Sequence, residues 1–402
     1  MRIAYIASGF PAFSETFVVR EAVEVRRLGH EVQVYSLKSR VDTCDYPPAE
    51  EVVRLTQYSP FLLSGRLLWA NLRTALRHPL RYCGALLFVL LHGLRTPIEC
   101  LKGLVAYPKT IYYGTLMCER GVEHVHAHFA NIPALSALII SRIWGIPYSF
   151  IAHAHDLYLY RSMLAEKLAG ARFAVTNSEY NREFLGRYCA AADMAKLTVL
   201  HCGGDVERLG KVVRRAEPDL VVSVSRLCEQ KGYVYLVDAC AILRQRGVGV
   251  RCLVAGEGPE RPRVEARVRE LGLEDGFDLP GRVPDVGDLL ARGRVFVLPC
   301  VEASDGQMDG IPTVLIEAMA AGIPVVSTTI SGVPELVRDG EGGLVVAPED
   351  PVALADAIER LLGDESLADR LAASGRQFVC DHYDLRKNAQ ALAELFERHS
   401  GS

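Results

Sequence analysis

The chain lacks the features by which several classes of protein are recognised. Eleven cysteines are scattered through its 402 residues without a C-x2-C pair or a Cys/His cluster, which argues against a zinc site. Their odd number and their place within apolar patterns indicate reduced thiols, so we expect a cytoplasmic protein. The sequence also has no internal repeat, low-complexity segment, complete G-x-G-x-x-G fingerprint or Asp-x-Asp loop. It therefore predicts neither a disordered chain nor a dinucleotide-dependent dehydrogenase.

Charge and hydropathy exclude two further classes. The formal net charge is −4, from 45 Lys and Arg against 49 Asp and Glu, which argues against nucleic acid as a partner. A bilayer-spanning helix needs about 20 apolar residues. The apolar run at 84–91 is shorter than this, and its extension to residue 94 includes His92. Residues 1–9 are apolar but soon interrupted, which predicts a first buried strand rather than a signal peptide.

The chain is long enough for two domains of ordinary size. Short apolar runs alternate with helical patterns, which is typical of βαβ units, and six strands are predicted in each half. We expect a Rossmann-like domain at 1–205, a polar linker at 206–218, a second domain at 219–380 and a C-terminal helix within 381–402. That helix has an apolar stripe at helical spacing: Leu385, Ala389, Leu392 and Leu395.

Residues 60–120 carry an uneven share of charge. Eight Lys or Arg stand against two acids there, and leucines, Trp69 and several tyrosines are interleaved with them. A basic amphipathic helical stretch of this kind suits the surface of an anionic membrane. The alternative is a pair of core helices whose arginines are solvated. The sequence leaves both interpretations open.

Two carboxylates stand close together in residues 300–328. Asp309 lies in a glycine-containing loop after an apolar strand, and Glu317 lies about one turn into the next helix. Ligands of open α/β sheets bind at the carboxyl ends of the strands, so both carboxylates should meet backbone N–H groups in one crevice. We expect Asp309 to bind hydroxyls of a donor sugar and Glu317 to bind a ribose. The expected contacts from the segment between them involve Gly310, Ile311 and Pro312.

Two cations, Arg226 and Lys231, stand where another predicted strand ends and a helix begins. Arginine can bind phosphate through two parallel hydrogen bonds, and lysine acts as a point charge. Such a clamp stabilises the negative charge on a departing nucleoside diphosphate in place of a metal ion. The alternative is two solvated side chains in an exposed turn. The acidic pair downstream favours the clamp.

Polar residues also follow predicted strands in the first half of the chain. Gly9 lets the backbone approach a diphosphate or sugar, and Ser14 is the predicted N-cap of a helix that ends at Gly29. A histidine at a strand end can hydrogen-bond a sugar hydroxyl or orient an acceptor. His126 and His128 alternate on one strand and therefore face the same side, which favours structural roles or a supporting role near the acceptor. The acceptor-side candidates are Thr16, His128, His155 and Asp156. A role in the site is favoured more for His153 than for His155.

These motifs, in order and rough spacing, resemble the retaining GT-B glycosyltransferases of family four, most closely the exopolysaccharide branch of colanic-acid and amylovoran types. Asp309 stands where much of that family has a glutamate, which is one methylene longer. The matching stretches are PAFSETF at 11–17, HAHFA at 126–130, AHAHD at 152–156, SRL and KG within 225–232, AGEGP at 255–259, DGQMDGIP at 305–312 and GVPE at 332–335.

The resemblance implies a GT-B fold, with two Rossmann-like domains facing each other across a cleft and a C-terminal helix crossing back to the first. It implies metal-independent transfer of a hexose from a nucleotide sugar, with a UDP-sugar favoured, to a hydroxyl of a lipid-linked oligosaccharide or small metabolite. Neither a cofactor nor a metal ion is implied. The catalytic candidates are Arg226, Lys231, Asp309 and His153. The resemblance adds donor-side candidates: Glu257, Arg282, Val283 and Glu335.

Three alternatives share the same scaffold: a GT-B sugar-nucleotide epimerase, a phosphorylase and a catalytically silent binding protein. A silent scaffold would be expected to lose Arg226, Lys231 or Glu317, and all three are present. The resemblance to the exopolysaccharide branch favours transfer over the other two.

Overall fold

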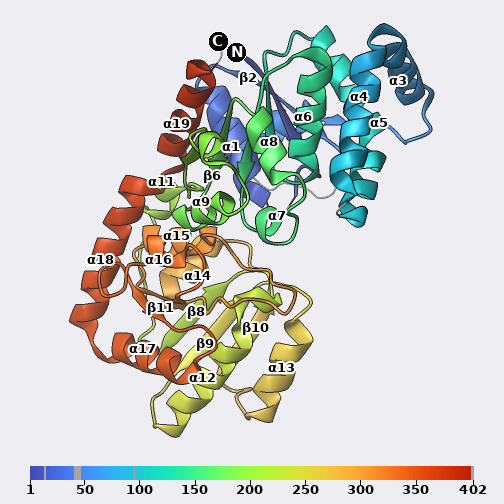
Figure 1. Cartoon of the computed structure of the whole chain (residues 1–402). Helices are drawn as coiled ribbons and strands as arrows, with labels where there is room; N and C mark the ends of the chain where they lie inside the picture. Colours follow the sequence, from blue (N-terminus) through green and yellow to red (C-terminus); the bar gives the residue numbers. More distant parts are fainter. Residues whose placement is uncertain (13–14, 40–46, 95, 400–402) are drawn as a thin grey trace. The chain divides into compact units, whose positions relative to one another are not determined.

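The computed structural model describes residues 1–12, 15–39, 47–94 and 96–399. The chain divides into two compact units, of which Met1–Leu200 with Arg386–Ser402 form the first and His201–Leu385 the second. Each unit contains one parallel β-sheet with helices packed on it (Figure 1). The two Rossmann-like sheets predicted from alternating strand and helix patterns are therefore confirmed.

Within the described residues, the sheet of the first unit has seven parallel strands in the order β3-β2-β1-β4-β5-β6-β7. Six of them match predicted strands, and the two-residue β3 was not predicted. The order reverses between β1 and β4, so the loops after these strands flank the point where open α/β sheets bind ligands. The strands are β1 (Arg2–Ala7), β2 (Glu31–Ser36), β3 (Gln57–Tyr58), β4 (His124–His128), β5 (Tyr148–Ala152), β6 (Phe173–Thr176) and β7 (Leu197–Val199).

Two helices of the first unit, α1 and α6, end where glycine permits a left-handed turn. Gly29 follows the first helix with φ 94°, as predicted, and Gly145 has φ 77° after α6. The predicted N-cap, Ser14, lies outside the described residues. The helices here are α1 (Thr16–Arg27), α2 (Glu50–Arg54), α6 (Ile132–Trp144), α7 (His155–Tyr158), α8 (Leu164–Gly170), α9 (Glu179–Gly186) and α10 (Ala191–Met194), and a 3-10 turn precedes α2 (Pro47–Ala49).

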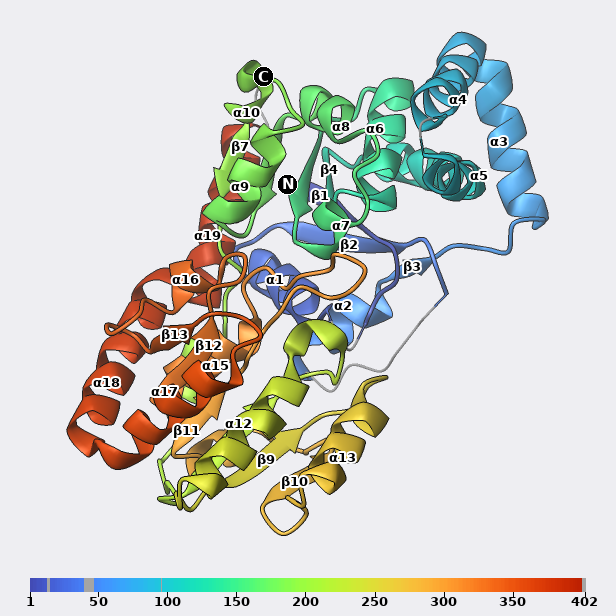
Figure 2. The same ribbon diagram turned by 60° about the horizontal axis from the view of Figure 1, so that its bottom comes forward.

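The basic stretch predicted at 60–120 forms three helices, α3 (Gly65–Arg77), α4 (Pro79–Gly93) and α5 (Pro97–Glu119). These three helices pack on one another, and α4 and α5 also pack on α6. Together they form a helical layer beside the sheet (Figure 2). This is one helix more than the predicted pair of core helices, and the outward sides carry leucines as well as arginines. Within the described residues, none of the helices combines the length and apolar character that crossing a bilayer requires.

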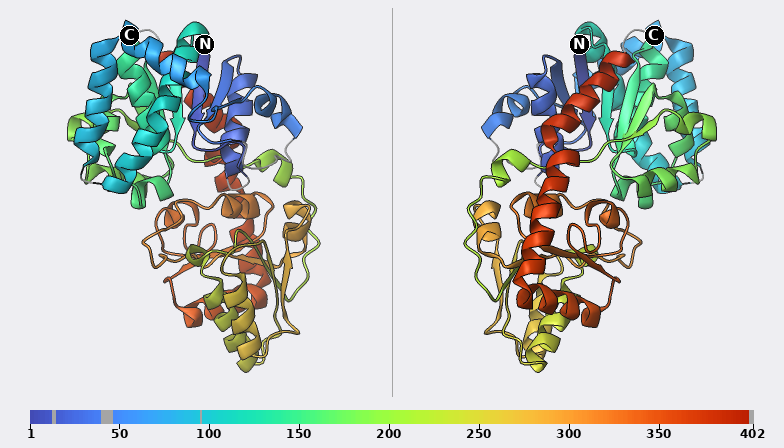
Figure 3. Two further views of the ribbon diagram at one scale, coloured as in Figure 1. Left: turned by 90° about the vertical axis from the view of Figure 1, so that its right-hand side faces the viewer. Right: turned by 90° about the vertical axis from the view of Figure 1, so that its left-hand side faces the viewer.

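The C-terminal helix α19 (Leu385–Arg398) belongs to the first unit, as predicted. The helix runs along the sheet of the first unit (Figure 3). Its apolar stripe is buried with residues of β1, α1 and β6, where Ala389, Leu392 and Leu395 join Phe396 in one core. Each added apolar side chain removes further surface from water, which holds this last helix on the sheet.

The second unit has six parallel strands in the order β10-β9-β8-β11-β12-β13, and the order reverses between β8 and β11. The strands are β8 (Leu220–Val224), β9 (Arg251–Ala255), β10 (Phe277–Gly281), β11 (Val295–Val297), β12 (Val325–Thr328) and β13 (Leu344–Val346). The helices are α11 (Val206–Leu209), α12 (Tyr233–Gln245), α13 (Arg261–Glu270), α14 (Val286–Arg292), α15 (Thr313–Ala320), α16 (Val333–Leu336), α17 (Pro351–Gly363) and α18 (Glu365–His382), and a 3-10 turn, η3, lies at Glu229–Lys231.

Candidate active site

Loops of the second unit converge at the carboxyl ends of β8 and β9. A Cβ atom at Gly256, where φ is 137°, would lie 1.9 Å from the carbonyl oxygen of Ser225. A Cβ atom at Gly258 would lie 2.1 Å from the carbonyl oxygen of Leu227. Only glycine allows so close an approach. The AGEGP and SRL motifs therefore pack backbone against backbone, and the exposed Arg226 stands at their junction.

Lys231 is held beside the loop that follows β11. Gly232, at φ 65°, packs so tightly that a Cβ atom there would lie 2.0 Å from the carbonyl oxygen of Pro299. The Lys231 Nζ atom lies 2.7 Å from Oδ2 of Asp309, and the two side chains are 12% and 21% exposed. The Cys300 thiol lies 3.6 Å from the same oxygen. The predicted phosphate ligand and the predicted sugar ligand thus form one ion pair at the reversal of the sheet.

The environment of this pair fixes its charges. Burial disfavours the charged form of Lys231, but the carboxylate of Asp309 outweighs burial and raises the lysine pKa above its usual range. Burial, and then the charge of Asp309, raise the pKa of Cys300 well above that of a free thiol. The site therefore holds an ammonium, a carboxylate and a neutral thiol, and a diphosphate would compete with Asp309 for the ammonium.

The remaining donor-side candidates of the second unit lie on several of its loops and helices. Gly310, Ile311 and Pro312 are buried immediately before α15, and Glu317 is partly exposed in the second turn of that helix. Glu335, in the first turn of α16, has Oε2 3.9 Å from Nε2 of His201, a partner that the sequence did not predict. The other three candidates differ in exposure and contacts: Glu257 pairs with Arg261 at 3.0 Å, Arg282 is exposed and Val283 is partly exposed.

In the first unit, an aromatic cluster surrounds His153 at the end of β5. The His153 ring is buried and lies 4.7 Å from the Phe17 ring and 4.8 Å from the Phe129 ring, centre to centre. Phe129 has φ 78°, an uncommon conformation for a residue with a side chain. The His128 ring stacks at 6.1 Å from that of His153. The strand ends of β4 and β5 thus bring the predicted acceptor-side histidines together, whereas His155 is exposed on α7.

Asp156 is fully buried, and its carboxylate fastens two loops. It accepts hydrogen bonds from the backbone amides of Ala130, at 2.5 Å, and His153, at 3.0 Å. Lys167, also buried, donates from Nζ to the carbonyl oxygens of Ala130 and Ser162, both at 2.7 Å. Burial raises the pKa of Asp156 to about 6 and lowers that of Lys167 to about 8. In this conformation Asp156 positions the ends of β4 and β5 from beneath.

Glu15, which was not among the predicted site residues, directly precedes α1 and the partly buried Thr16. Burial raises its pKa from 4.5 to about 7, and the negative charge of Asp156 adds to this against the charges of His128 and Lys38. A carboxyl group with a pKa near neutral, in the turn after β1, is a candidate for proton exchange with an acceptor hydroxyl. The sequence places Glu15 in the turn after β1, as it does Gly9. It does not show that Glu15 is buried, so its raised pKa could not be predicted.

Replacing Glu15 by glutamine is expected to reduce the pH dependence of stability. Because folding raises the pKa of Glu15, its stabilising contribution is complete below about pH 4.5 and is lost as pH rises through about 7. The Glu15→Gln variant lacks this loss, so its melting temperature should fall less between pH 5 and pH 8 than that of the parent. Glu50→Gln, at an exposed position, is the matched control. An unchanged pH dependence in Glu15→Gln would contradict the assignment.

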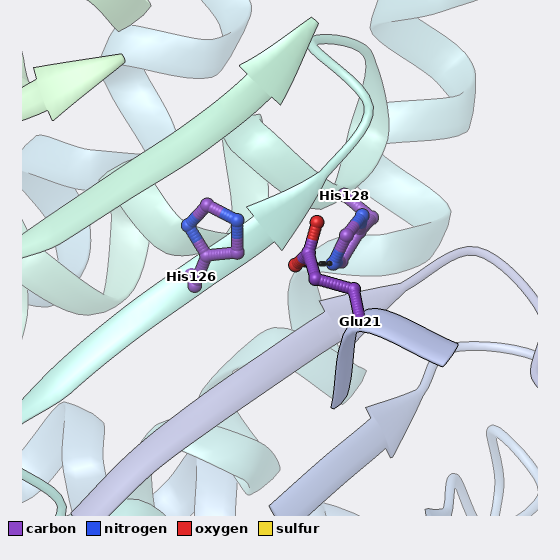
Figure 4. A group of neighbouring side chains, drawn as sticks. All are labelled: Glu21, His126 and His128. Carbon is purple, nitrogen blue, oxygen red and sulfur yellow. Dashed lines mark ion pairs between the residues drawn. The ribbon is translucent and has the colours of Figure 1, made fainter. Parts of the chain in front are cut away.

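Glu21, His126 and His128 form a buried polar group beneath this region (Figure 4). The Tyr5 hydroxyl donates to Oε1 of Glu21 at 3.0 Å, and Nε2 of His128 lies 3.3 Å from the same oxygen. The ligand-type atoms of the three side chains lie within 4.8 Å of one another. Ligands of one tetrahedral zinc ion lie about 3.4 Å apart, so a zinc ion would require these side chains to draw closer. The two histidines share one side of β4, as their alternation predicted.

Comparison with known proteins adds to this geometry. The family described as "Glycosyl transferases group 1" matches residues 218–364. The chain is 35% identical over 207 residues to the putative colanic acid biosynthesis glycosyltransferase WcaL of Salmonella typhimurium, which covers 50% of this chain and about half, 51%, of that relative. It is 26% identical over 447 residues to the amylovoran biosynthesis glycosyltransferase AmsK of Erwinia amylovora, which covers 99% of this chain and all of AmsK.

Solved structures agree with the fold. HepE of Anabaena, crystallised with UDP, superposes with a TM-score of 0.73 at 19% identity and covers 99% of this chain and 100% of that one. At this identity the similarity bears on fold alone. It confirms the predicted GT-B fold class, together with the two parallel sheets and the C-terminal helix packed in the first unit.

Proposed function

Because this chain belongs to the group 1 glycosyltransferases, also known as family four, we propose that it transfers a sugar from a nucleotide-sugar donor to a hydroxyl acceptor in exopolysaccharide biosynthesis. The observation that carries the proposal is the ion pair between Lys231 and Asp309 at the sheet reversal of the second unit. This reversal is where parallel α/β sheets bind nucleotides.

The proposed donor is a UDP-sugar. HepE, which shares the fold, has been crystallised with UDP and with UDP-glucose, which supports this choice. Arg226 and Lys231 bind the diphosphate, Glu317 binds the ribose and Asp309 binds hydroxyls of the sugar. Backbone groups of Gly310 and Ile311 would complete the contacts to the sugar or distal phosphate, and Arg282 with Val283 would lie near the base.

The proposed reaction retains the configuration at the anomeric carbon. A double displacement needs a carboxylate nucleophile beneath that carbon, and the chain offers no clear candidate. We therefore favour attack from the same face as the departing group, through an oxocarbenium-like state. A leaving phosphate oxygen then accepts the proton of the acceptor hydroxyl, and the bond to the sugar carbon forms as the bond to the phosphate oxygen breaks. The two cations stabilise the charge that develops on the diphosphate.

A transfer and hydrolysis assay against UDP-, GDP- and ADP-sugars, with products identified by mass spectrometry, tests the proposal. With an acceptor present, we expect UDP and a glycosylated acceptor as products. Without an acceptor, we expect UDP and free sugar. Turnover should be higher with UDP-sugars than with GDP- or ADP-sugars. Recovery of an isomerised sugar nucleotide without transfer would instead identify an epimerase. A phosphate-dependent formation of sugar phosphate would identify a phosphorylase.

Activity is expected to survive removal of divalent metal ions. Arg226 and Lys231 supply the positive charge that a metal ion would otherwise bring to the leaving diphosphate. Turnover in an excess of EDTA over total divalent ion should equal turnover in buffer without EDTA. Complete loss of activity with EDTA, restored by Mn²⁺ or Mg²⁺, would show that a metal ion stabilises the leaving group.

The acceptor is the least constrained partner. A lipid-linked oligosaccharide and a small soluble metabolite both offer the required hydroxyl. Contact of residues 60–120 with a membrane surface, one of the two interpretations that the sequence leaves open, would favour the lipid-linked acceptor, because an enzyme held at the bilayer meets such an acceptor in two dimensions. His153 and Thr16, on the first unit, are the proposed acceptor-side contacts.

A further inference from the structure

Exposed apolar side chains gather in one layer of the first unit. Among the described residues, nineteen large hydrophobic side chains are exposed, and fourteen of these lie between Phe61 and Val105. Scattered exposed leucines are ordinary on a soluble protein, but such a concentration marks an interaction site. We call this set the α3–α5 face: Phe61, Leu63, Leu68, Trp69, Leu72, Leu76, Leu80, Leu87, Leu90, Leu91, Leu94, Ile98, Leu101 and Val105.

Helix α3 is apolar on two opposite sides. Its inner side is buried against the rest of the unit at Leu67, Ala70 and Thr74. Leu68, Leu72 and Leu76 recur every fourth residue, so they line one outward stripe, which Trp69 widens. These four side chains are 52–73% exposed. The inner side satisfies the fold, and the outer side is left for a partner.

Helices α4 and α5 repeat this pattern. On α4, Leu80, Leu87 and Leu91 are 87%, 53% and 57% exposed at helical spacing. On α5, Ile98 and Leu101 are 71% and 63% exposed one turn apart. A helix with one side facing water normally carries polar residues on that side. Because three neighbouring helices depart from this rule together, we infer that they form one binding surface.

Most of the charged residues around these stripes are basic. At about 100° per residue, Arg66, Arg73 and Arg77 fall along one flank of the leucine stripe of α3. Arg66 and Arg77 are exposed, as is Lys102 on α5, whereas Arg73 pairs with Glu119 at 2.8 Å. Leucines and a tryptophan bordered by arginines are the composition of helices that lie in the interface of an anionic bilayer.

We propose that the α3–α5 face docks on an anionic lipid surface, with its leucines and Trp69 in the headgroup boundary and its arginines against lipid phosphates. A second copy of this chain fits less well. A two-fold interface would bring Arg66 and Arg77 of both copies together, with few carboxylates in the layer to pair with them. Only the consequence that the acceptor is lipid-linked depends on the proposed function.

Co-sedimentation with vesicles tests the docking. The full-length protein should partition onto vesicles of phosphatidylglycerol and phosphatidylethanolamine, and less onto phosphatidylcholine, with binding that weakens as salt is raised. A Leu72→Ser/Leu76→Ser variant should bind at least tenfold less. Val213→Ser/Val352→Ser, which changes two exposed valines of the second unit, is the matched control and should bind like the parent. Arg66→Gln/Arg77→Gln should lose the preference for anionic lipid.

Other results would overturn the proposal. Equal recovery with and without vesicles, or equal binding by the two serine double variants, removes the lipid surface as the partner. A dimer in sedimentation analysis that Leu72→Ser/Leu76→Ser dissociates, without vesicle binding, assigns the face to a second copy. Vesicle binding needs no sugar nucleotide, so it is unaffected if the transfer activity fails. Conversely, hydrolysis of a UDP-sugar should be the same in both serine variants, because neither changes a donor-side residue.

Discussion

Replacing Lys231 by alanine is expected to lower kcat/KM at least about thirtyfold, a loss of about 2 kcal/mol of transition-state stabilisation, as for removal of one charged donor. The ammonium lies in a largely buried position against Asp309, and its charge is maintained there. In a partly desolvated site such a charge acts more strongly on the leaving diphosphate than it would in water. Steady-state kinetics with the best donor of the panel, alongside melting temperatures, measures the effect.

Lys211→Ala is the matched control for this variant. Lys211 also pairs with a carboxylate, Glu207, at 2.9 Å, but its side chain is 73% exposed. The Lys211→Ala variant should keep the activity of the parent. Turnover of Lys231→Ala within a factor of two of the parent would remove Lys231 from the clamp. Because Lys231 and Asp309 are in contact, the double variant with Asp309→Asn should lose less than the sum of the two single losses.

Replacing Asp309 by asparagine is expected to lower transfer at least about tenfold, as for loss of a charged hydrogen-bond acceptor. UDP affinity should stay within about threefold of the parent or tighten, because Lys231 loses its counter-ion and becomes available to phosphate. Glu317→Ala should have the opposite profile and weaken UDP binding about tenfold, since the ribose contact is lost. Calorimetry with UDP and turnover of both variants separate the two roles.

An outcome in which Asp309→Asn weakens UDP as much as Glu317→Ala would show that the division between sugar ligand and ribose ligand is wrong. Asp309 is shorter than the glutamate expected from the family resemblance. The Asp309 carboxylate also forms an ion pair with Lys231. On binding a donor it would have to share its oxygens between the ammonium and a sugar hydroxyl. Asp309→Glu, which restores the methylene, is the informative companion variant.

Local patterns predicted most of the fold. Short apolar runs bounded by turns gave the six strands of the second unit, because parallel strands are buried on both faces and show no alternation. The β3 strand was not predicted because two residues, Gln57 and Tyr58, form no pattern. The outward leucines of α3 were not distinguished from core leucines, since spacing alone does not say which apolar side a fold buries.

The candidate site was predicted residue by residue but not as an arrangement. Lys231 and Asp309 were assigned to different parts of the donor, and their ion pair depends on the packing of Gly232 against Pro299, which no local pattern reveals. The glycines at 256 and 258 stood out in the sequence as part of a stretch that matches the family. In the structure they make room for the backbone of Ser225 and Leu227. The elevated pKa of Glu15 depends on burial by residues distant in sequence.

The position of α19 has a consequence for synthesis of the protein. The first unit draws its core from both ends of the chain, because Leu392 and Phe396 are buried beside Ile3 and Val19. On the ribosome the strands of this unit emerge first, yet the helix that closes its core emerges only after all of His201–Leu385. Since domains tend to fold as their residues appear, the second unit can fold while the first is still incomplete. The first unit thus completes its core only after the second unit has emerged, and its apolar sheet face needs protection until α19 follows.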